Sequence, residues 1–299
     1  MTTEEINYAI KRTKQIIEFG GYKPYSEYSF LCGCSNENQE AISKVLDYKN
    51  KDILTVAASG EQYFSSKFYG AKNVTLYDIN NLAKLYVYLK IGAMKSLDYE
   101  KYMSFLVSKE NKNYLSINTL LKISDYIPDY ISKYWYYILK NFNYYQLEKL
   151  ILYPTDFKGE PVSLKPEPYY TQENYEKLKK IIENEKYPKF ISSSIYNIAE
   201  KINEQKFDVI DTSNIIECIL RDSWEFDCYN DDIITNWISL IENKLAKLLN
   251  ENGQIIVDYV PSNSSNPLVN NKSFKKYKIN SKINNSVKSL LLVYKNKEH

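Results

Sequence analysis

Apolar runs alternate with amphipathic stretches over the first hundred residues. The run DILTVAAS, from Asp52 to Ser59, is rich in apolar residues and ends at small ones, which predicts a buried strand of about eight residues. GEQYFSSKFYGA then predicts a helix that stops near Gly70. NVTLYDIN predicts a second strand, and NLAKLYVYLKIGAMKSL follows with helical spacing. This β-α-β-α order predicts a parallel sheet with helical crossovers.

A helix is also expected upstream of this sheet, from Ser35 to Leu46. Ser35 or Asn36 can cap its amino end, and Glu37 and Glu40 suit its first turn because acidic side chains favour the amino end of a helix.

After residue 100 the strand–helix rhythm breaks. Residues 101–150 have a helical pattern, residues 153–170 carry four prolines and predict a loop, and residues 171–186 predict another helix. Strand patterns return at PKFISSS, FDVIDTSN and GQIIVDYV, and an amphipathic helix is expected over 231–250. FKKYKIN and VKSLLLVYK close the chain, and their short link predicts that the last strand runs antiparallel.

The expected fold class is therefore α/β. It is a doubly wound, mostly parallel, Rossmann-like sheet of about seven strands, with a large helical insertion between the second and third strands. We expect residues 1–50 to form an amino-terminal cap of helix and loop. Residues 51–107 and 189–299 would form the ligand-binding domain, and residues 108–188 the insertion, as a lid or acceptor region.

Composition narrows the function classes. The 299 residues carry 39 basic and 37 acidic side chains, a balance that gives no electrostatic case for a nucleic-acid partner. No apolar run approaches the roughly 20 residues of a membrane span, and the polar amino terminus is unlike a signal peptide, so we expect a cytoplasmic protein. No metal site is expected, since the only histidine is the last residue, His299. The cysteines are expected to be reduced or buried thiols: Cys32, Cys34, Cys218 and Cys228.

The small-residue turn and the acid Asp78 end two adjacent predicted strands. In an open parallel sheet, ligands bind outside the carboxyl ends of the strands, where the strand order reverses. Small residues at Ala58, Ser59 and Gly60 let a ligand approach the backbone, and the next helix offers free N–H groups. Asp78 follows about 20 residues later, the spacing at which an acid binds a ribose in nucleotide-binding folds.

The motifs that are absent from the turn limit the class of ligand. It has no G-x-G-x-x-G pattern and no G-K-[ST], so a dinucleotide and a P-loop nucleotide are both disfavoured. S-adenosylmethionine (SAM) has a ribose and no phosphate, and it fits. Other readings stay open: a plain strand–helix turn with Asp78 as a helix cap, an ordinary Rossmann enzyme, and a SAM-fold binding protein without turnover.

Two stretches carry a family resemblance: TVAASGEQYFSSKFYGAKNVTLYDIN and LKIGAMKSLDYEKYMSFL. They resemble the SAM-dependent 3-amino-3-carboxypropyl transferases of betaine-lipid synthesis and their uncharacterised relatives, which are class I methyltransferase-like proteins with an inserted helical region. The resemblance covers residues 25–107 and, more loosely, 189–260.

The resemblance implies a site at four strand ends. Ser59, Gly60, Glu61 and Gln62, next to Ala58, would surround the amino-acid part of SAM, Asp78 would hold the ribose, and Ile79 would lie against the adenine. Ser193 and Ser194 would lie near the adenine amino group, where members of the family often have an acid. The end of the fourth strand would face the sulfonium and the acceptor: Asp211, Ser213 and Asn214.

A SAM-dependent transferase moving an aminocarboxypropyl or methyl group is therefore the expected function, with SAM as co-substrate. Asp211 could take a proton or orient the acceptor, with Asn214 beside it; the alternative is that Asp211 only caps the following turn. The acceptor would be a small or lipid-like molecule. The lipid-synthesis members have a Trp-containing motif where this chain has SNEN, so a diacylglycerol acceptor is not supported. The alternative function is a catalytically inactive SAM- or nucleoside-binding regulatory or scaffold protein.

Overall fold

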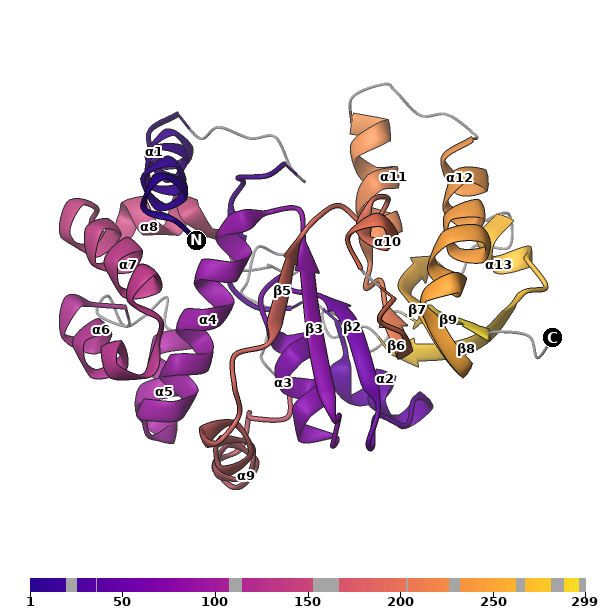
Figure 1. Ribbon diagram of the computed structural model, residues 1–299, viewed down its shortest axis with the longest axis horizontal. Coiled ribbons are helices and arrows are strands. Elements are labelled where there is room, and N and C mark those ends of the chain that lie inside the picture. The colour runs from indigo at the N-terminus through magenta and orange to yellow at the C-terminus, as the bar shows by residue number, and fades with distance from the viewer. Residues whose placement is uncertain are drawn as a thin grey trace.

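The computed structural model describes residues 1–19, 26–35, 37–107, 115–152, 167–202, 204–225, 232–261, 267–280 and 288–295. Within these residues the centre of the fold is a seven-stranded sheet with the order β5-β3-β2-β6-β7-β9-β8 (Figure 1). β9 is antiparallel to β7 and to β8, and the other pairs are parallel. The strands are β2 (Asp52–Val56), β3 (Asn73–Asp78), β5 (Lys189–Ser192), β6 (Phe207–Asp211), β7 (Leu249–Pro261), β8 (Phe274–Asn280) and β9 (Lys288–Lys295).

This sheet confirms the fold class predicted from the sequence. The seven strands lie where the apolar runs predicted them, and the antiparallel pairing of the last strand agrees with the short link before it. The chain leaves β2 for β3 and β5 on one side and then returns to β6 on the other side, so the strand order reverses at β2.

Successive side chains of the inner strands point to opposite faces of the sheet, as the pleat requires. In β2, Ile53 belongs to one hydrophobic cluster and Leu54 to the other. In β6, Val209 and Ile210 divide in the same way. Both faces are therefore covered, which explains why these strands read as continuous apolar runs and not as alternating ones.

One face of the sheet packs against α2 (Gln39–Val45), α3 (Glu61–Phe68) and α4 (Asn81–Ser96). The other face packs against α10 (Ile198–Lys201), α11 (Ile215–Glu225), α12 (Asp232–Leu240) and α13 (Pro267–Asn270). The stretch expected to be a single helix over 231–250 is α12 followed by a π turn, Ile241–Leu245, and a 3-10 turn, Ala246–Leu248; β7 then begins at Leu249.

Between β3 and β5 the described chain is mainly helical, as the pattern over 101–150 and 171–186 predicted. The elements are α5 (Tyr99–Val107), α6 (Ile117–Ile123), η1 (Ser124–Tyr126), α7 (Asp129–Asn141), α8 (Tyr144–Leu150), the short strand β4 (Ile151–Leu152) and α9 (Gln172–Glu183). β4 pairs in parallel with β1 (Leu31–Cys32), a two-stranded sheet that the sequence did not predict. The division into domains stays a prediction.

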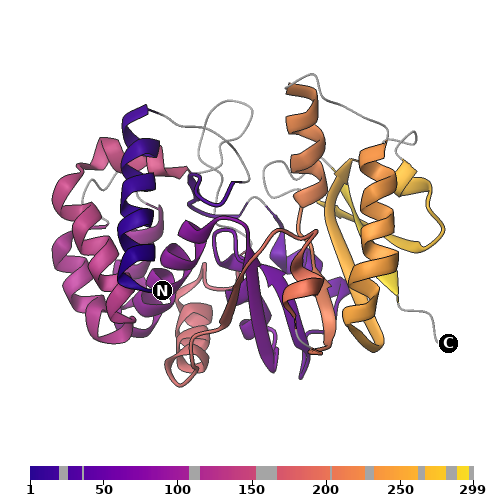
Figure 2. The same cartoon turned by 45° about the horizontal axis from the view of Figure 1, so that its top comes forward.

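The first helix, α1 (Thr3–Phe19), packs against α7 and α8. Figure 2 shows it, in indigo, among the magenta helices on the side of the sheet opposite the orange α11 and α12. The hydroxyls of Thr13 and Tyr134 are hydrogen-bonded at 2.7 Å, and the Trp135 indole donates to the Leu85 carbonyl at 2.9 Å. Both aromatic side chains are fully buried, so they form the core of this helical group.

One helix boundary differs from the prediction. α2 begins at Gln39 with Asn38 as its N-cap, and the Asn38 side chain accepts from the Ala41 N–H. Ser35 therefore does not cap the helix; its hydroxyl accepts from the Glu37 N–H instead, and Asn36 lies outside the described residues. Glu37 precedes the helix, and its side chain is left to turn inward.

No helix in the described ranges is long and apolar enough to cross a membrane.

Candidate functional site

The predicted site residues gather where the strand order reverses. β2 lies between β3 and β6, and parallel strands bring their carboxyl ends to the same edge of the sheet. The turn from Ala58 to Gln62 follows β2, Asp78 and Ile79 end β3, and the segment from Asp211 to Asn214 ends β6. Ser193 and Ser194 follow β5, the outer neighbour of β3. The topology therefore brings all the predicted positions to one edge.

Two of these strand ends have backbone in the left-handed region. Ala58 after β2 has φ 41° and Ser213 after β6 has φ 52°, a conformation that is costly for residues other than glycine. Gly60 has φ 94°, and a Cβ there would lie 3.3 Å from a methyl group of Val87. The turn therefore requires glycine at position 60 for both conformation and space, and strain of this kind clusters at ligand-binding sites.

Asp78 joins the tips of β2 and β3. Its carboxylate accepts the Ala58 N–H at 2.9 Å through Oδ2 and the Asn80 N–H at 2.8 Å through Oδ1. The cap of α4 is Asn80, whose side chain accepts from the Leu82 N–H, so Asp78 is not the cap itself. Burial raises the pKa of Asp78 to about 6. A carboxylate offers about four lone-pair sites, so this partly exposed group can accept further hydrogen bonds from a ligand.

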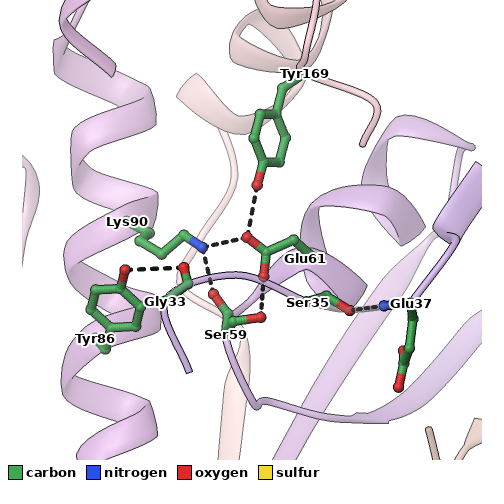
Figure 3. Close-up of polar contacts among 8 residues, drawn as sticks. All are labelled: Gly33, Ser35, Glu37, Ser59, Glu61, Tyr86, Lys90 and Tyr169. Atoms are coloured by element: carbon green, nitrogen blue, oxygen red, sulfur yellow. Dashed lines mark hydrogen bonds and ion pairs between the residues drawn. The ribbon is translucent and has the colours of Figure 1, made fainter. Parts of the chain in front are cut away.

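Glu61, the first residue of α3, points into the protein (Figure 3). Its Oε1 lies 2.6 Å from the Lys90 ammonium of α4 and accepts from the Tyr169 hydroxyl at 2.8 Å. The Ser59 hydroxyl donates to Oε2, and Lys90 also donates to the Ser59 carbonyl at 2.6 Å. Glu61 and Lys90 are both fully buried, and this ion pair holds the turn against α4.

Glu37 lies on the other side of the same turn and is also buried. Its Oε2 accepts from the amide nitrogens of Gln39 at 2.9 Å and Gln62 at 3.0 Å. Its Oε1 accepts from the Ser213 hydroxyl and from the Asn214 N–H at 3.2 Å. One carboxylate thus links the segment before α2, the turn after β2 and the end of β6.

Asp211 is the second buried acid of this cluster. Its Oδ1 accepts the Ser213 N–H at 2.7 Å, and its Oδ2 accepts from the Thr55 hydroxyl at 3.3 Å. Ser213 therefore contacts both carboxylates. Burial raises the pKa of both acids, and the negative charge of Asp211 raises the pKa of Glu37 further.

The pKa of the Tyr48 hydroxyl is affected by the same acids. Burial is the main cause that raises the pKa of Tyr48 well above its ordinary value, and the charges of Asp211, Asp258 and Glu37 follow in that order. Asp258, on β7, is fully buried too.

The remaining predicted residues lie at the rim. Ile79 and Asn214 are partly exposed, as is Ser194. Ser193 is buried; its N–H donates to the Asp78 carbonyl at 2.9 Å, and its hydroxyl donates to the Ser194 carbonyl at 3.0 Å. The turn after β5 is thereby held beside Asp78.

Three residues of the site were not predicted in these roles: Glu37, Lys90 and Tyr169. The sequence does contain a signal for Lys90, because a lysine within the apolar face of a long amphipathic helix is unusual. Glu37 and Tyr169 carry no such signal, since each lies in an irregular segment and contacts other strand ends or turns that are distant along the chain.

Within the described ranges, no three histidine, cysteine, aspartate or glutamate side chains converge as a metal ion would require. Among the described residues, Cys32, Cys34 and Cys218 form no disulfide; Cys228 and His299 lie outside the described residues.

Comparisons with known proteins do not assign the chain to a family. No protein-family profile matches the chain, and no curated protein matches it. Among solved structures, a candidate methylase of Haemophilus influenzae is similar at 12% identity over 87% of this chain and 88% of its own, with a TM-score of 0.37. The rRNA methyltransferase AviRa of Streptomyces viridochromogenes shares 12% identity over 86% of this chain and 81% of its own, with a TM-score of 0.39.

A candidate SAM-dependent methyltransferase of Streptococcus mutans shares 9% identity and has a TM-score of 0.40; the match covers 88% of this chain and 50% of that one. This chain thus matches half the length of the Streptococcus protein. The strand order and the antiparallel β9 establish the fold as a doubly wound, mostly parallel α/β sheet.

Proposed function

We propose that this protein is a SAM-dependent transferase that moves a methyl or an aminocarboxypropyl group to a small or lipid-like acceptor. The observation that carries the proposal is Asp78. It ties the tip of β2 to the tip of β3 through the Ala58 N–H, at the point where the strand order reverses, and its carboxylate keeps capacity for the two hydroxyls of a ribose.

The proposed pose follows the strand ends. The adenosine lies over β3 and β5, with the ribose on Asp78, the adenine against Ile79 and its amino group toward Ser193 and Ser194. The amino-acid part lies over the turn after β2, and the sulfonium points toward the end of β6.

The buried hydrogen bonds around Glu61 change the role that we propose for it. The Glu61 carboxylate is occupied by Lys90, Tyr169 and Ser59, so Glu61 serves the site by fixing the turn. The groups of the turn that meet the ligand are then the backbone of Ala58 to Gly60 and the Gln62 amide.

The chemistry is a displacement at carbon. A lone pair of the acceptor forms a bond to a carbon attached to the sulfonium, the C–S bonding pair moves to sulfur, and a neutral thioether leaves. Asp211, at the end of β6 beside Asn214, accepts the proton that the acceptor loses. Holding the acceptor in line at near-attack distance supplies much of the rate.

The test is a product assay. The purified protein is incubated with SAM and fractionated cell extract, and nucleoside products are followed by mass spectrometry. S-adenosylhomocysteine indicates methyl transfer, and methylthioadenosine indicates aminocarboxypropyl transfer. The Asp211→Asn variant should abolish either product. Binding without either product from any fraction would favour the non-catalytic SAM- or nucleoside-binding role, and no SAM binding would refute both.

A further inference from the structure

Two buried carboxyl groups, those of Glu37 and Asp211, lie together near the carboxyl ends of β2 and β6. Glu37 and Asp211 are 1% and 3% exposed, and Ser213 contacts both. Among the described residues, no ion pair involves either acid. Buried carboxylates without a partner charge are costly, so an arrangement of this kind is suited to a cationic ligand.

Gln62 provides an independent observation that points to a ligand. Its side chain is 2% exposed, and its Oε1 accepts no hydrogen bond from any described residue. The orientation of the amide is determined by Glu37: a carboxylate only accepts, so the NH2 group of Gln62 faces it, and the carbonyl oxygen is left as an acceptor beside the acid cluster.

We infer that Asp211 and Gln62 Oε1 form a binding site for a primary ammonium group, and that Glu37 positions Gln62 and adds its charge to the site. Glu37 already accepts four hydrogen bonds, so its lone pairs are occupied. Asp211 accepts two, and it keeps capacity for an N–H donor. An alkylammonium offers three N–H donors and one positive charge, which match an acid and a neutral carbonyl oxygen.

An ammonium fits better than a metal ion. Mg²⁺ and Ca²⁺ take six or more oxygen ligands, with carboxylates that are free to coordinate. Here Glu37 is filled by protein donors, and the described residues bring together no set of three metal-ligating side chains.

The inference deepens the proposed function and depends on it for the ligand. Two molecules could supply the ammonium: SAM, through the α-amino group of its amino-acid part, or an amine acceptor. The first arm of the test separates them. Calorimetry compares S-adenosylhomocysteine with its analogue that has hydrogen in place of the α-amino group. If SAM supplies the ammonium, the wild-type protein should bind the amino compound about ten- to hundredfold more tightly.

The second arm titrates n-butylamine against n-butanol, with and without saturating S-adenosylhomocysteine. If the acceptor supplies the ammonium, the two adenosyl ligands bind alike, and only the amine shows saturable binding. In either case Gln62→Met and Glu37→Gln should reduce the preference for the amino compound, or for the amine, to within about threefold. Glu40→Gln, on the exposed surface of α2, is the matched control and should keep the wild-type preference.

The outcomes are separable. If the wild-type protein binds no adenosyl ligand, the proposed function fails, and the butylamine titration alone decides the ammonium site. If it binds S-adenosylhomocysteine yet prefers neither the amino compound nor the amine, the ammonium site is refuted. Competition by Mg²⁺ or Ca²⁺ at millimolar concentration would also refute it, in favour of a metal site. Thermal melts of each variant establish that it is folded.

Discussion

Two clusters of buried acids flank the turn after β2, and they differ in how their charge is balanced. On one side Glu61 meets the ammonium of Lys90 at 2.6 Å, with both side chains fully buried. On the other side Glu37 and Asp211 are linked through Ser213, with hydrogen-bond donors around them and no cation among the described residues. Adjacent residues of the turn, Glu61 and Gln62, face the two clusters.

This difference in charge balance distinguishes a structural role from a ligand-binding role. A buried acid that has its own lysine is complete without a ligand, and removal of either partner leaves an unpaired charge. The Glu37–Asp211 pair has only neutral donors among its described partners, so no opposite charge offsets the burial that raises the pKa of both groups. We interpret the Glu61–Lys90 pair as the support of the turn and the Glu37–Asp211 pair as part of the binding surface.

Removing the cation of the balanced cluster should give the largest effect. Lys90→Met leaves Glu61 buried without a charge partner, and we expect a loss of about 3–5 kcal/mol in the free energy of unfolding. Urea denaturation at neutral pH measures it. The double variant Lys90→Met/Glu61→Gln should recover a large part of the loss. A single variant that loses less than about 1 kcal/mol would contradict the role of support.

Removing Asp78, the proposed ribose-binding acid, should affect binding more than folding. Asp78→Ala should weaken SAM binding by about ten- to hundredfold, because charge-assisted hydrogen bonds are worth about 1.5–3 kcal/mol. Calorimetry measures the affinity, and Asp52→Ala, at the opposite end of the adjacent strand, is the control that should keep it.

The same interaction predicts a pH dependence. Burial raises the pKa of Asp78 to about 6, so the wild-type affinity should be constant above pH 7 and fall as the carboxylate is protonated below pH 6. An affinity that stays unchanged down to pH 5 would contradict a role for the ionised group.

Alanine substitutions at Gly60 and Gly70 distinguish the effect of backbone strain from the effect of the geometry of the site. Gly60 and Gly70 have φ of 94° and 90°, so alanine is strained at both positions. A Cβ at position 60 also meets Val87 at 3.3 Å, whereas the nearest atom to one at position 70 is 3.7 Å away. We expect Gly60→Ala to lose roughly 1–2 kcal/mol of stability and to weaken SAM binding, and Gly70→Ala to lose about 1 kcal/mol with binding intact. Equal effects on binding would remove the special role of the turn.

Replacing Glu37, which has no cation partner among the described residues, should change how the stability depends on pH. Because the pKa of Glu37 is raised in the folded state, its contribution to stability is fully present below its unfolded pKa and is lost as the pH rises through the folded value. The stability of Glu37→Gln relative to wild type should therefore increase between pH 4 and pH 8. Urea denaturation across that range measures it. A flat difference for Glu37→Gln would contradict the raised pKa.

Much of the framework could be predicted from the sequence. The apolar runs from Asp52 and Asn73 became β2 and β3, and the turn and Asp78 meet at their carboxyl ends. These features are local: a run of apolar residues, a glycine that permits a positive φ, and an acid at a strand end are all properties of short segments.

The predicted helix start at Ser35 was wrong, and the reason is tertiary. Ser35 and Glu37 both suit the first turn of a helix, but the Glu37 side chain finds four donors from α2, the turn after β2 and the end of β6. Those donors satisfy a buried carboxylate better than a solvated helix end does, so the helix begins two residues after Glu37.

The sequence by itself determined the order of the strands along the chain, the reversal of direction at the end and the chemistry at each strand tip, because these depend on short-range patterns. Only the tertiary structure decided which acids acquire a partner. Whether Glu61 meets Lys90, and whether Glu37 meets Asp211 through Ser213, depends on contacts between segments up to about 177 residues apart. Charge balance in a buried site is a property of the packed neighbourhood, and the linear pattern of residues does not contain it.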